Sequence, residues 1–390
     1  MSGRYLVPAA CRPYRPYPHA VRCLPDFSGP LRRSLGVPDA CPVAAAGPDC
    51  APAKGGCCPA GGFFVRCRRC SARAAWSAGA LSYHCAPYGC GGGCHMPELP
   101  EVETIARGLA PELTGRRITE VEVFNAGSVQ GDREVFDACT PGRVIAGVGR
   151  RGKLLLVHLE KERRQGAACR AVLDHRPAGD TPDMLAFHLR MSGRLFIYGP
   201  EQLPGPHTRI IITLDSGRRL FFDDARKFGS CRALSPFSRP LWRFWATLGP
   251  EPLDVDRETF IEQFAERRKA VKALLLDQTV IAGVGNIYAD ESLFRAGIRP
   301  DARPGDWTRD EAERRLGRLY DELREVLREA ISECGSSIRD YRDARGDAGA
   351  FQNCFRVYGR SGMQCVSCRD ALTTARVAGR TTVYCSNCQK

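Results

Sequence analysis

The sequence predicts an α+β protein built from a half rich in strands, a half rich in helices and a small cysteine hairpin. Short strand-like runs separated by Gly, Pro, Asn and Asp fill residues 117–222, and the apolar spacing becomes helical after Leu248. Two Cys-x-x-Cys pairs then close the chain. Many short strands with regular turn signals are typical of a β-sandwich, so we expect a sandwich with a leading helix in the first half.

Residues 1–95 differ from everything that follows. They hold 11 Lys or Arg against three Asp and no Glu, carry 11 of the 20 cysteines, and show no sustained strand or helix period. We interpret them as a low-order extension that is not part of the mature protein. The alternative is a second metal module of Cys67, Cys70, Cys85 and Cys90, but neither pair is matched by a second pair at metal spacing.

The first expected domain spans residues 97–235. Its leading helix starts near Met96, because Pro100 suits a first turn and apolar residues recur every three or four positions up to Leu109. The polar, turn-rich segment Glu160–Asp183 is expected to be an inserted surface loop. The strand-like runs are Arg117–Phe124, Arg143–Val148, Leu154–Leu159, Leu185–Leu189, Arg194–Ile197, Ile210–Leu214 and Arg219–Phe222.

The second expected domain spans residues 248–352 and is helical. The longest of its helices is heavily charged and is therefore expected to be amphipathic and solvated on one side. No apolar run in the chain approaches 18 residues, so we expect no membrane span. The segments with helical spacing are Phe260–Phe264, Val271–Leu276, Ile287–Phe294 and Glu311–Ile331.

The third expected domain, residues 354–390, carries the strongest single pattern. Two Cys-x-x-Cys pairs separated by sixteen residues suit one structural Zn²⁺ held by four thiolates. Thr373–Val377 and Thr381–Tyr384 between them have the form of a hairpin with Arg380 at its tip. Arg380 either holds a phosphate or is simply solvated. The four expected ligands are Cys365, Cys368, Cys385 and Cys388.

The net charge of +13 suggests a polyanionic partner, but the ends of the chain supply it and residues 97–353 are neutral overall. A DNA-binding surface must therefore come from local clustering. One cluster of basic residues precedes the glycine loop that leads to Asn286. The helix that is expected to begin there could bind a phosphate at its N-terminus. The alternative is that Asn286 only caps the helix.

A further candidate is the sequence Met96-Pro97-Glu98. If the chain began at Pro97, its secondary amine would have a pKa near or below 8 and could attack a sugar carbon to form an iminium. Glu98 could then move protons to and from the sugar. The alternative is that Pro97 is an ordinary helix-start proline.

Several motifs of the chain, in their order along the sequence, resemble those of formamidopyrimidine-DNA glycosylases over nearly all of residues 96–390. The resemblance rests on Met96-Pro-Glu-Leu-Pro-Glu-Val-Glu-Thr, Arg150-Arg-Gly-Lys153, His188-Leu-Arg-Met-Ser-Gly193, Leu248-Gly-Pro-Glu-Pro-Leu253, Gly283-Val-Gly-Asn-Ile-Tyr-Ala289 and the four cysteines. It implies a β-sandwich joined to a helix–two-turns–helix domain and a zinc finger, with double-stranded DNA between the halves.

The resemblance also implies residue roles. Pro97 would be the nucleophile, Glu98 the acid and base, and Lys153 a backbone contact at the lesion. DNA contacts would come from His207, Arg226, Asn286 and Arg380, and the space left by the flipped nucleotide would be filled by Met191 and Phe228. The segment Gly335–Phe351 would hold the lesion-recognition loop. The family usually has Pro and Arg where this chain has Ala225 and Lys227.

The implied reaction is excision of oxidised purines such as 8-oxoguanine and formamidopyrimidines, followed by elimination of both flanking phosphates. Two alternatives stay open: an endonuclease VIII-type enzyme for oxidised pyrimidines, and a non-catalytic zinc DNA-binding protein if residues 1–95 are retained. An RNA-binding zinc ribbon is disfavoured because stacking aromatics are lacking. We expect a cytoplasmic, nucleoid-associated monomer, since the cysteine spacing suits a reducing compartment.

Overall fold

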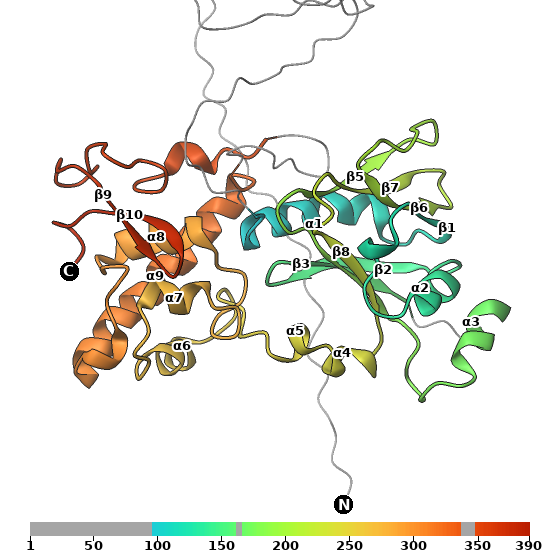
Figure 1. The fold of residues 1–390 in the computed structure, drawn as a ribbon, viewed down its shortest axis with the longest axis horizontal. Helices are drawn as coiled ribbons and strands as arrows, with labels where there is room; N and C mark the ends of the chain where they lie inside the picture. Colours follow the sequence, from blue (N-terminus) through green and yellow to red (C-terminus); the bar gives the residue numbers. More distant parts are fainter. Residues whose placement is uncertain (1–95, 161–165, 337–347) are drawn as a thin grey trace, which may run out of the picture. The chain divides into compact units, whose positions relative to one another are not determined.

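Two four-stranded antiparallel sheets share an apolar core in the first half of the folded chain (Figure 1). The structure is a computed structural model that describes residues 96–160, 166–336 and 348–390. The extension 1–95 and its candidate cysteines lie outside the described residues. One sheet has the order β1-β6-β7-β5, from Ile118–Val123, Thr208–Leu214, Arg219–Asp224 and Gly193–Tyr198; the other has β2-β3-β4-β8, from Ile145–Arg151, Leu154–Leu159, Met184–His188 and Ser230–Leu234.

Helix α1, Leu99–Leu113, joins this sandwich to the rest of the molecule. Its apolar stripe of Val102, Ile105 and Leu109 is at most 1% exposed and belongs to the sandwich core. Leu99 at its start packs instead in the helical core. The predicted sandwich with a leading helix is thus confirmed, and the helix has one end in each core.

The second sheet is covered on both faces. Its outer face packs against Trp242, Phe244 and Trp245, which lie on and between the short helices α4, Ser238–Leu241, and α5, Arg243–Ala246. Strand β3 is therefore apolar at nearly every position rather than at every second one. Strand β8 and these two helices are not predicted by the sequence pattern.

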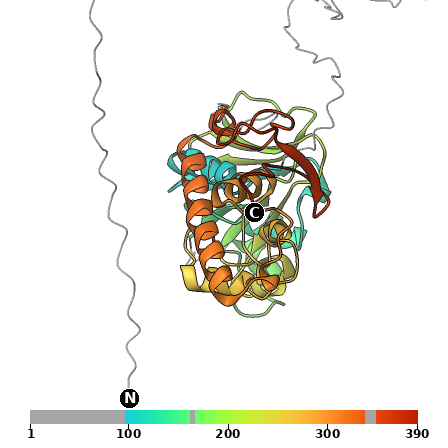
Figure 2. The same cartoon turned by 90° about the vertical axis from the view of Figure 1, so that its left-hand side faces the viewer.

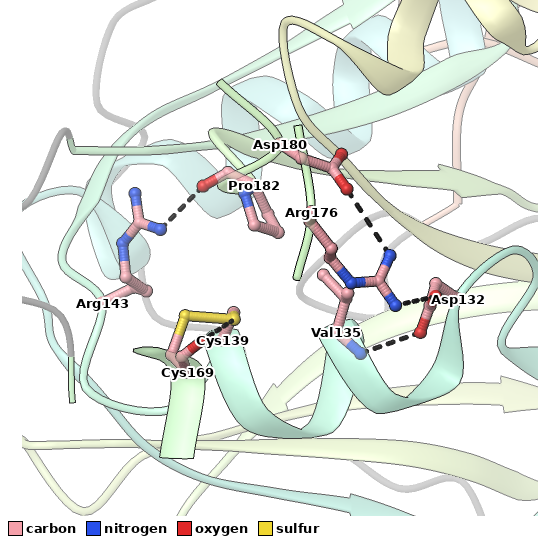
Figure 3. Close-up of a disulfide and its surroundings, with 8 residues drawn as sticks. All are labelled: Asp132, Val135, Cys139, Arg143, Cys169, Arg176, Asp180 and Pro182. Atoms are coloured by element: carbon pink, nitrogen blue, oxygen red, sulfur yellow. Dashed lines mark hydrogen bonds and ion pairs between the residues drawn. A yellow bond between two sulfur atoms is a disulfide. The ribbon is translucent and has the colours of Figure 1, made fainter. Parts of the chain in front are cut away.

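The expectation that residues 160–183 form only a loop is wrong in part. Residues Ala167–Leu173 form helix α3, which packs against α2, Arg133–Cys139 (Figure 3). A disulfide joins Cys139 to Cys169 within a small cluster of apolar side chains. Further ties come from Arg176, which bonds Asp132 and Asp180, and from Arg143, which donates to the Pro182 carbonyl at 2.7 Å.

The second half is helical, as predicted. Helix α8, Asn286–Ala296, contacts both α7, Val271–Leu276, and α9, Arg309–Ser332 (Figures 1 and 2). Helix α9 has one buried stripe of leucine, valine and alanine. None of the helices in the described ranges has the length and apolar run needed to cross a bilayer. Helix α6 spans Arg257–Phe264, and short 3-10 turns lie at Ala126–Ser128, Pro304–Asp306 and Phe351–Cys354.

A two-stranded hairpin ends the chain. Strands β9, Thr373–Val377, and β10, Arg380–Tyr384, pair through the turn at Ala378 and Gly379, which both have positive φ. Its small core includes Phe294 of α8, so the hairpin rests on the helical half. The predicted hairpin is confirmed.

Candidate active site

The start of α1 lies against the glycine loop that precedes α8. The Leu99 amide donates to the Gly283 carbonyl at 3.0 Å. A Cβ at Gly285 would come within 2.2 Å of the Glu98 carboxyl carbon, so only glycine allows this approach. The sequence predicts this loop as a possible phosphate site. In the structure the loop also packs directly against the Glu98 side chain.

Glu98 is buried, with 4% of its surface exposed. Its Oε1 accepts a hydrogen bond from the Ile287 amide at 3.1 Å, and its buried Oε2 has no partner among the described residues. Burial raises the pKa of Glu98 to about 7. The positive charge of Lys153 lowers this pKa, and the negative charge of Glu101 raises it. Near neutral pH this carboxyl can therefore both donate and accept a proton.

Lys153 lies close to Glu98 and is also buried, with 7% exposed. Burial lowers the pKa of its ammonium, while Glu98 and Glu101 oppose that effect. The charge of each group therefore shifts the pKa of the other. The structure thus brings Glu98, the predicted acid and base, close to Lys153, the predicted backbone contact.

An ion network holds the turn that carries Lys153. Arg151 donates to the Glu251 carboxylate at 2.9 Å and to the Gly249 carbonyl at 2.6 Å, and Arg150 bonds Glu251 and Glu103. Burial favours protonation of Glu251, but the two arginines and the Gly152 amide outweigh it and lower its pKa. This network ties the end of β2 to the segment that enters the helical half.

Glu101 has a role that the sequence did not reveal. Its carboxylate accepts from the Glu98 amide at 2.9 Å, the Tyr288 hydroxyl at 2.5 Å and the Ser336 amide at 2.8 Å. Tyr288 and Ser336 are far away in sequence, so no local pattern could have paired them. Glu101 therefore links α1 to α8 and to Ser336, which lies shortly after the end of α9.

The structure also has a cavity of about 540 Å³, and neither Glu98 nor Lys153 is among the residues that line it. Three of the predicted residues, Met191, Phe228 and Arg380, line it. The remaining lining residues are Met96, Arg190 and Lys227, so the rim carries three cationic side chains and one residue next to Pro97. Neither His207 nor Asn286 lines it.

The buried carboxylate of Asp224 fixes the two loops that carry Met191 and Phe228. It bonds the Ser192 hydroxyl from one loop, and the Arg226 and Gly229 amides from the other at 3.2 and 2.6 Å. Phe228 is 54% exposed, and the Arg226 guanidinium lies 4.9 Å from its ring centre. An aromatic ring held in solvent in this way is available for stacking.

His188 was noted in the sequence only as part of a motif. Burial, together with Arg190 and Lys153, lowers its pKa to about 3. Its Nδ1 accepts a hydrogen bond from the Arg190 amide at 3.1 Å, so the neutral ring carries its proton on Nε2. The ring thereby helps to set the loop that leads to Met191.

Two further predicted residues have different surroundings. Asn286 is the first residue of α8, Gly285 is the N-cap, and the Asn286 Nδ2 donates to the Thr381 carbonyl at 3.2 Å. The interpretation of Asn286 as the cap is therefore wrong. His207 is exposed, and its carbonyl accepts from the Asp224 amide.

The four predicted cysteines converge. Their sulfur atoms lie within 4.8 Å of one another, with Cys365 and Cys388 at 3.8 Å and Cys368 and Cys385 at 3.4 Å. Four sulfurs on a tetrahedron with bonds of about 2.3 Å would be separated by about 3.8 Å. The cluster could therefore hold a metal ion with little rearrangement.

The sequence profile of the formamidopyrimidine-DNA glycosylase N-terminal domain matches residues 96–231, and that of the helix–two-turns–helix domain of the same enzymes matches residues 248–342. The chain belongs to the formamidopyrimidine-DNA glycosylase family. It is thus related to DNA glycosylases of base-excision repair, and the matched part begins at Met96.

Relatives support this membership. The formamidopyrimidine-DNA glycosylase of Nitratidesulfovibrio vulgaris is 47% identical, with 76% of this chain and all of the relative covered. That of Desulfitobacterium hafniense is 40% identical over 75% of this chain and all of the relative. A complex of Lactococcus lactis Fpg with DNA containing an abasic site has a TM-score of 0.64 at 31% identity, covering 75% and 99% of the two chains. A complex of the same enzyme with DNA containing N7-benzyl-Fapy-dG has the same TM-score and identity.

Proposed function

We propose that this protein is a bifunctional DNA glycosylase and AP lyase that excises oxidised purines through a Schiff base on Pro97. The observation that carries the proposal is the buried Glu98 carboxyl, with its pKa of about 7 and one free oxygen, directly after Pro97. A group in that protonation range can donate to a leaving base and later accept a proton from the sugar.

In the proposed reaction the Pro97 nitrogen forms a bond to C1′ as the bond from C1′ to the base breaks, and Glu98 supplies the proton that the departing base needs. The Pro97 nitrogen then loses its proton to the Glu98 carboxylate, which passes it to O4′ as the C1′–O4′ bond breaks. The opened sugar is an iminium, which acidifies the C2′ proton. Loss of that proton expels the 3′ phosphate, and a second elimination expels the 5′ phosphate. Lys153 holds the backbone at the lesion, and no step needs a metal.

DNA recognition rests on the cavity and its surroundings. The Lactococcus lactis enzyme has been solved with DNA that contains an abasic site or N7-benzyl-Fapy-dG, and we infer the same substrate class here. Arg380 would hold a phosphate, with Asn286, His207 and Arg226 as further DNA contacts. Met191 and Phe228 line the cavity from loops that Asp224 fixes, and apolar side chains there would replace lost base stacking.

The ion that we propose for the four cysteines is a structural Zn²⁺. It would hold the ends of the hairpin that carries Arg380 and lie outside the chemistry.

The peptide bond between Met96 and Pro97 decides whether the reaction can occur. While it is intact, the Pro97 nitrogen is an amide whose lone pair is delocalised into the Met96 carbonyl, so it is not a nucleophile. Met96 itself lines the cavity. A chain that keeps this bond would therefore bind damaged DNA without cutting it, which is the second candidate function.

Borohydride trapping on an 8-oxoguanine:cytosine duplex tests the proposal. Protein expressed from its native gene should give an adduct that mass spectrometry maps to an N-terminal Pro97. Pro97→Gly, in a chain started at Met96, should lose most strand cleavage and keep lesion binding. An adduct at another residue, or unchanged cleavage by the glycine variant, would refute the mechanism. Faster release of thymine glycol than of 8-oxoguanine would favour the endonuclease VIII type.

A further inference from the structure

A fully buried ion pair joins the two helices that face the cysteine hairpin. The Lys272 ammonium of α7 lies 2.6 Å from the Asp290 carboxylate of α8, and both side chains are 0% exposed. Removing two charges from water costs more than their attraction returns unless the remaining polar atoms also find partners. The surroundings of the pair therefore indicate what it does.

Among the residues that the structure describes, the other side-chain hydrogen bonds of this pair go to strand β10. The ammonium has three protons, and besides Asp290 its neighbours are the Thr382 hydroxyl at 2.7 Å and the Thr381 carbonyl at 3.4 Å. The second Asp290 oxygen accepts from the Val383 amide at 3.2 Å. The pair thus binds three consecutive residues of one strand through both backbone and side chain.

Strand β10 begins with Arg380, which lines the cavity beside Met191 and Phe228. The cysteine cluster fixes the hairpin only at its opposite end, at Cys385 and Cys388. The tip would pivot about that end if nothing held the strand between them. One bond there comes from the Asn286 Nδ2, which donates to the Thr381 carbonyl at 3.2 Å. The buried pair supplies directional bonds at the residues next to Arg380, and it adds no net charge that would repel a phosphate.

We propose that Asp290 is a positioning residue that, through Lys272 and the Val383 amide, fixes strand β10 so that the Arg380 guanidinium meets a DNA phosphate at the cavity. This inference rests on the proposed function, in which Arg380 binds DNA. Asp290 itself would not touch the substrate.

A double-mutant cycle in the full-length chain tests the inference. The proteins are wild type, Arg380→Ala, Asp290→Asn and the double variant, bound to a duplex with a tetrahydrofuran abasic analogue. The contribution of residues 1–95 is common to all four and cancels. We expect Arg380→Ala to weaken binding about tenfold and to lower the slope of log Kd against log salt by about one. Asp290→Asn should reproduce most of both effects, and the double variant should be no weaker than Arg380→Ala.

Controls separate positioning from general stability. Asp321→Asn removes one partner of the exposed pair, 2.8 Å apart, between Asp321 of α9 and Arg257 of α6, and should bind as wild type does. Metal content and the unfolding midpoint are measured for every variant. If Asp290→Asn loses its metal, the apolar pair Lys272→Met with Asp290→Leu takes its place, because such replacements often keep the fold. It should weaken binding as Arg380→Ala does.

Independent, multiplying effects of Asp290→Asn and Arg380→Ala would overturn the inference, as would a wild-type salt slope in Asp290→Asn. Hydrogen exchange of residues 380–384 in the free protein gives a readout without DNA. Exchange should be faster in Asp290→Asn with the metal retained, and unchanged exchange overturns the inference even if the enzyme is active. Equal affinity of the wild type for damaged and undamaged duplexes would instead overturn the proposed function.

Discussion

Glu98→Gln should make the protein more stable in alkaline solution, although it removes a group that the proposed reaction needs. The wild-type carboxyl is buried, and its pKa rises from 4.5 to about 7 on folding. A group with a raised folded pKa contributes stability that is fully present below its unfolded pKa and is lost as pH rises through its folded pKa. Gln resembles the protonated acid and does not titrate in this range.

The size of the effect follows from the shift. The difference between 4.5 and about 7 corresponds to roughly 3 kcal/mol at about 1.4 kcal/mol per pH unit. The two proteins should be about equally stable near pH 4.5, because Gln keeps an oxygen for the Ile287 amide. The advantage of the Gln variant should grow up to pH 7 and level off near 3 kcal/mol above it.

Urea unfolding of both proteins at pH 5, 6, 7 and 8.5 measures this difference, with equal m-values as the condition for comparing them. Other titrating groups are shared, so the difference between the two curves reports the titration of Glu98 together with its coupling to Lys153. A difference that stays constant over this range would refute the reasoning, since it would mean that the carboxyl titrates alike in the folded and unfolded chains.

Three other changes have expected outcomes. Phe228→Ala should leave the thermal midpoint unchanged because the ring is 54% exposed, and should weaken binding to an abasic duplex about tenfold without altering its salt slope. Cys169→Ala should lower the free energy of unfolding by about 3 to 4 kcal/mol under oxidising conditions, as loop-closure entropy predicts for a separation of 30 residues. The wild-type protein should lose the same amount when a reductant is added. A wild type whose stability does not change in reductant would contradict this. Glu251→Gln should cost about 2 to 3 kcal/mol at pH 7, because Arg150 and Arg151 lose an anionic partner. Since the Glu251 pKa is lowered on folding, that cost should shrink as pH falls below 4.5, which acid titration of both proteins would check.

Local patterns were sufficient where a segment can be recognised from its own run of apolar residues. Leu154–Leu159 and Val271–Leu276 form the predicted strand and helix with the predicted ends. The segment Ala167–Leu173 was mispredicted because its helix depends on burial of Cys169 against α2, a contact that the sequence does not show.

The same contrast holds for the site. Motif order led to Pro97, Glu98 and Lys153, but the pKa of Glu98 comes from its burial against a glycine loop nearly 190 residues away in the chain. Likewise, Glu101 and Asp290 are ordinary helical acids in the sequence and become specific only through their distant partners.

The sequence by itself determined the family, the order of sandwich, helical half and hairpin, and the four cysteines that converge. These depend on residue types at fixed spacings along one element or one loop. Only the tertiary structure decided which charges are buried together, which loops Asp224 and Glu101 fix, and where Arg380 meets the cavity. The physical reason is that desolvation and hydrogen-bond geometry are set by neighbours in space, and a linear pattern does not specify those neighbours.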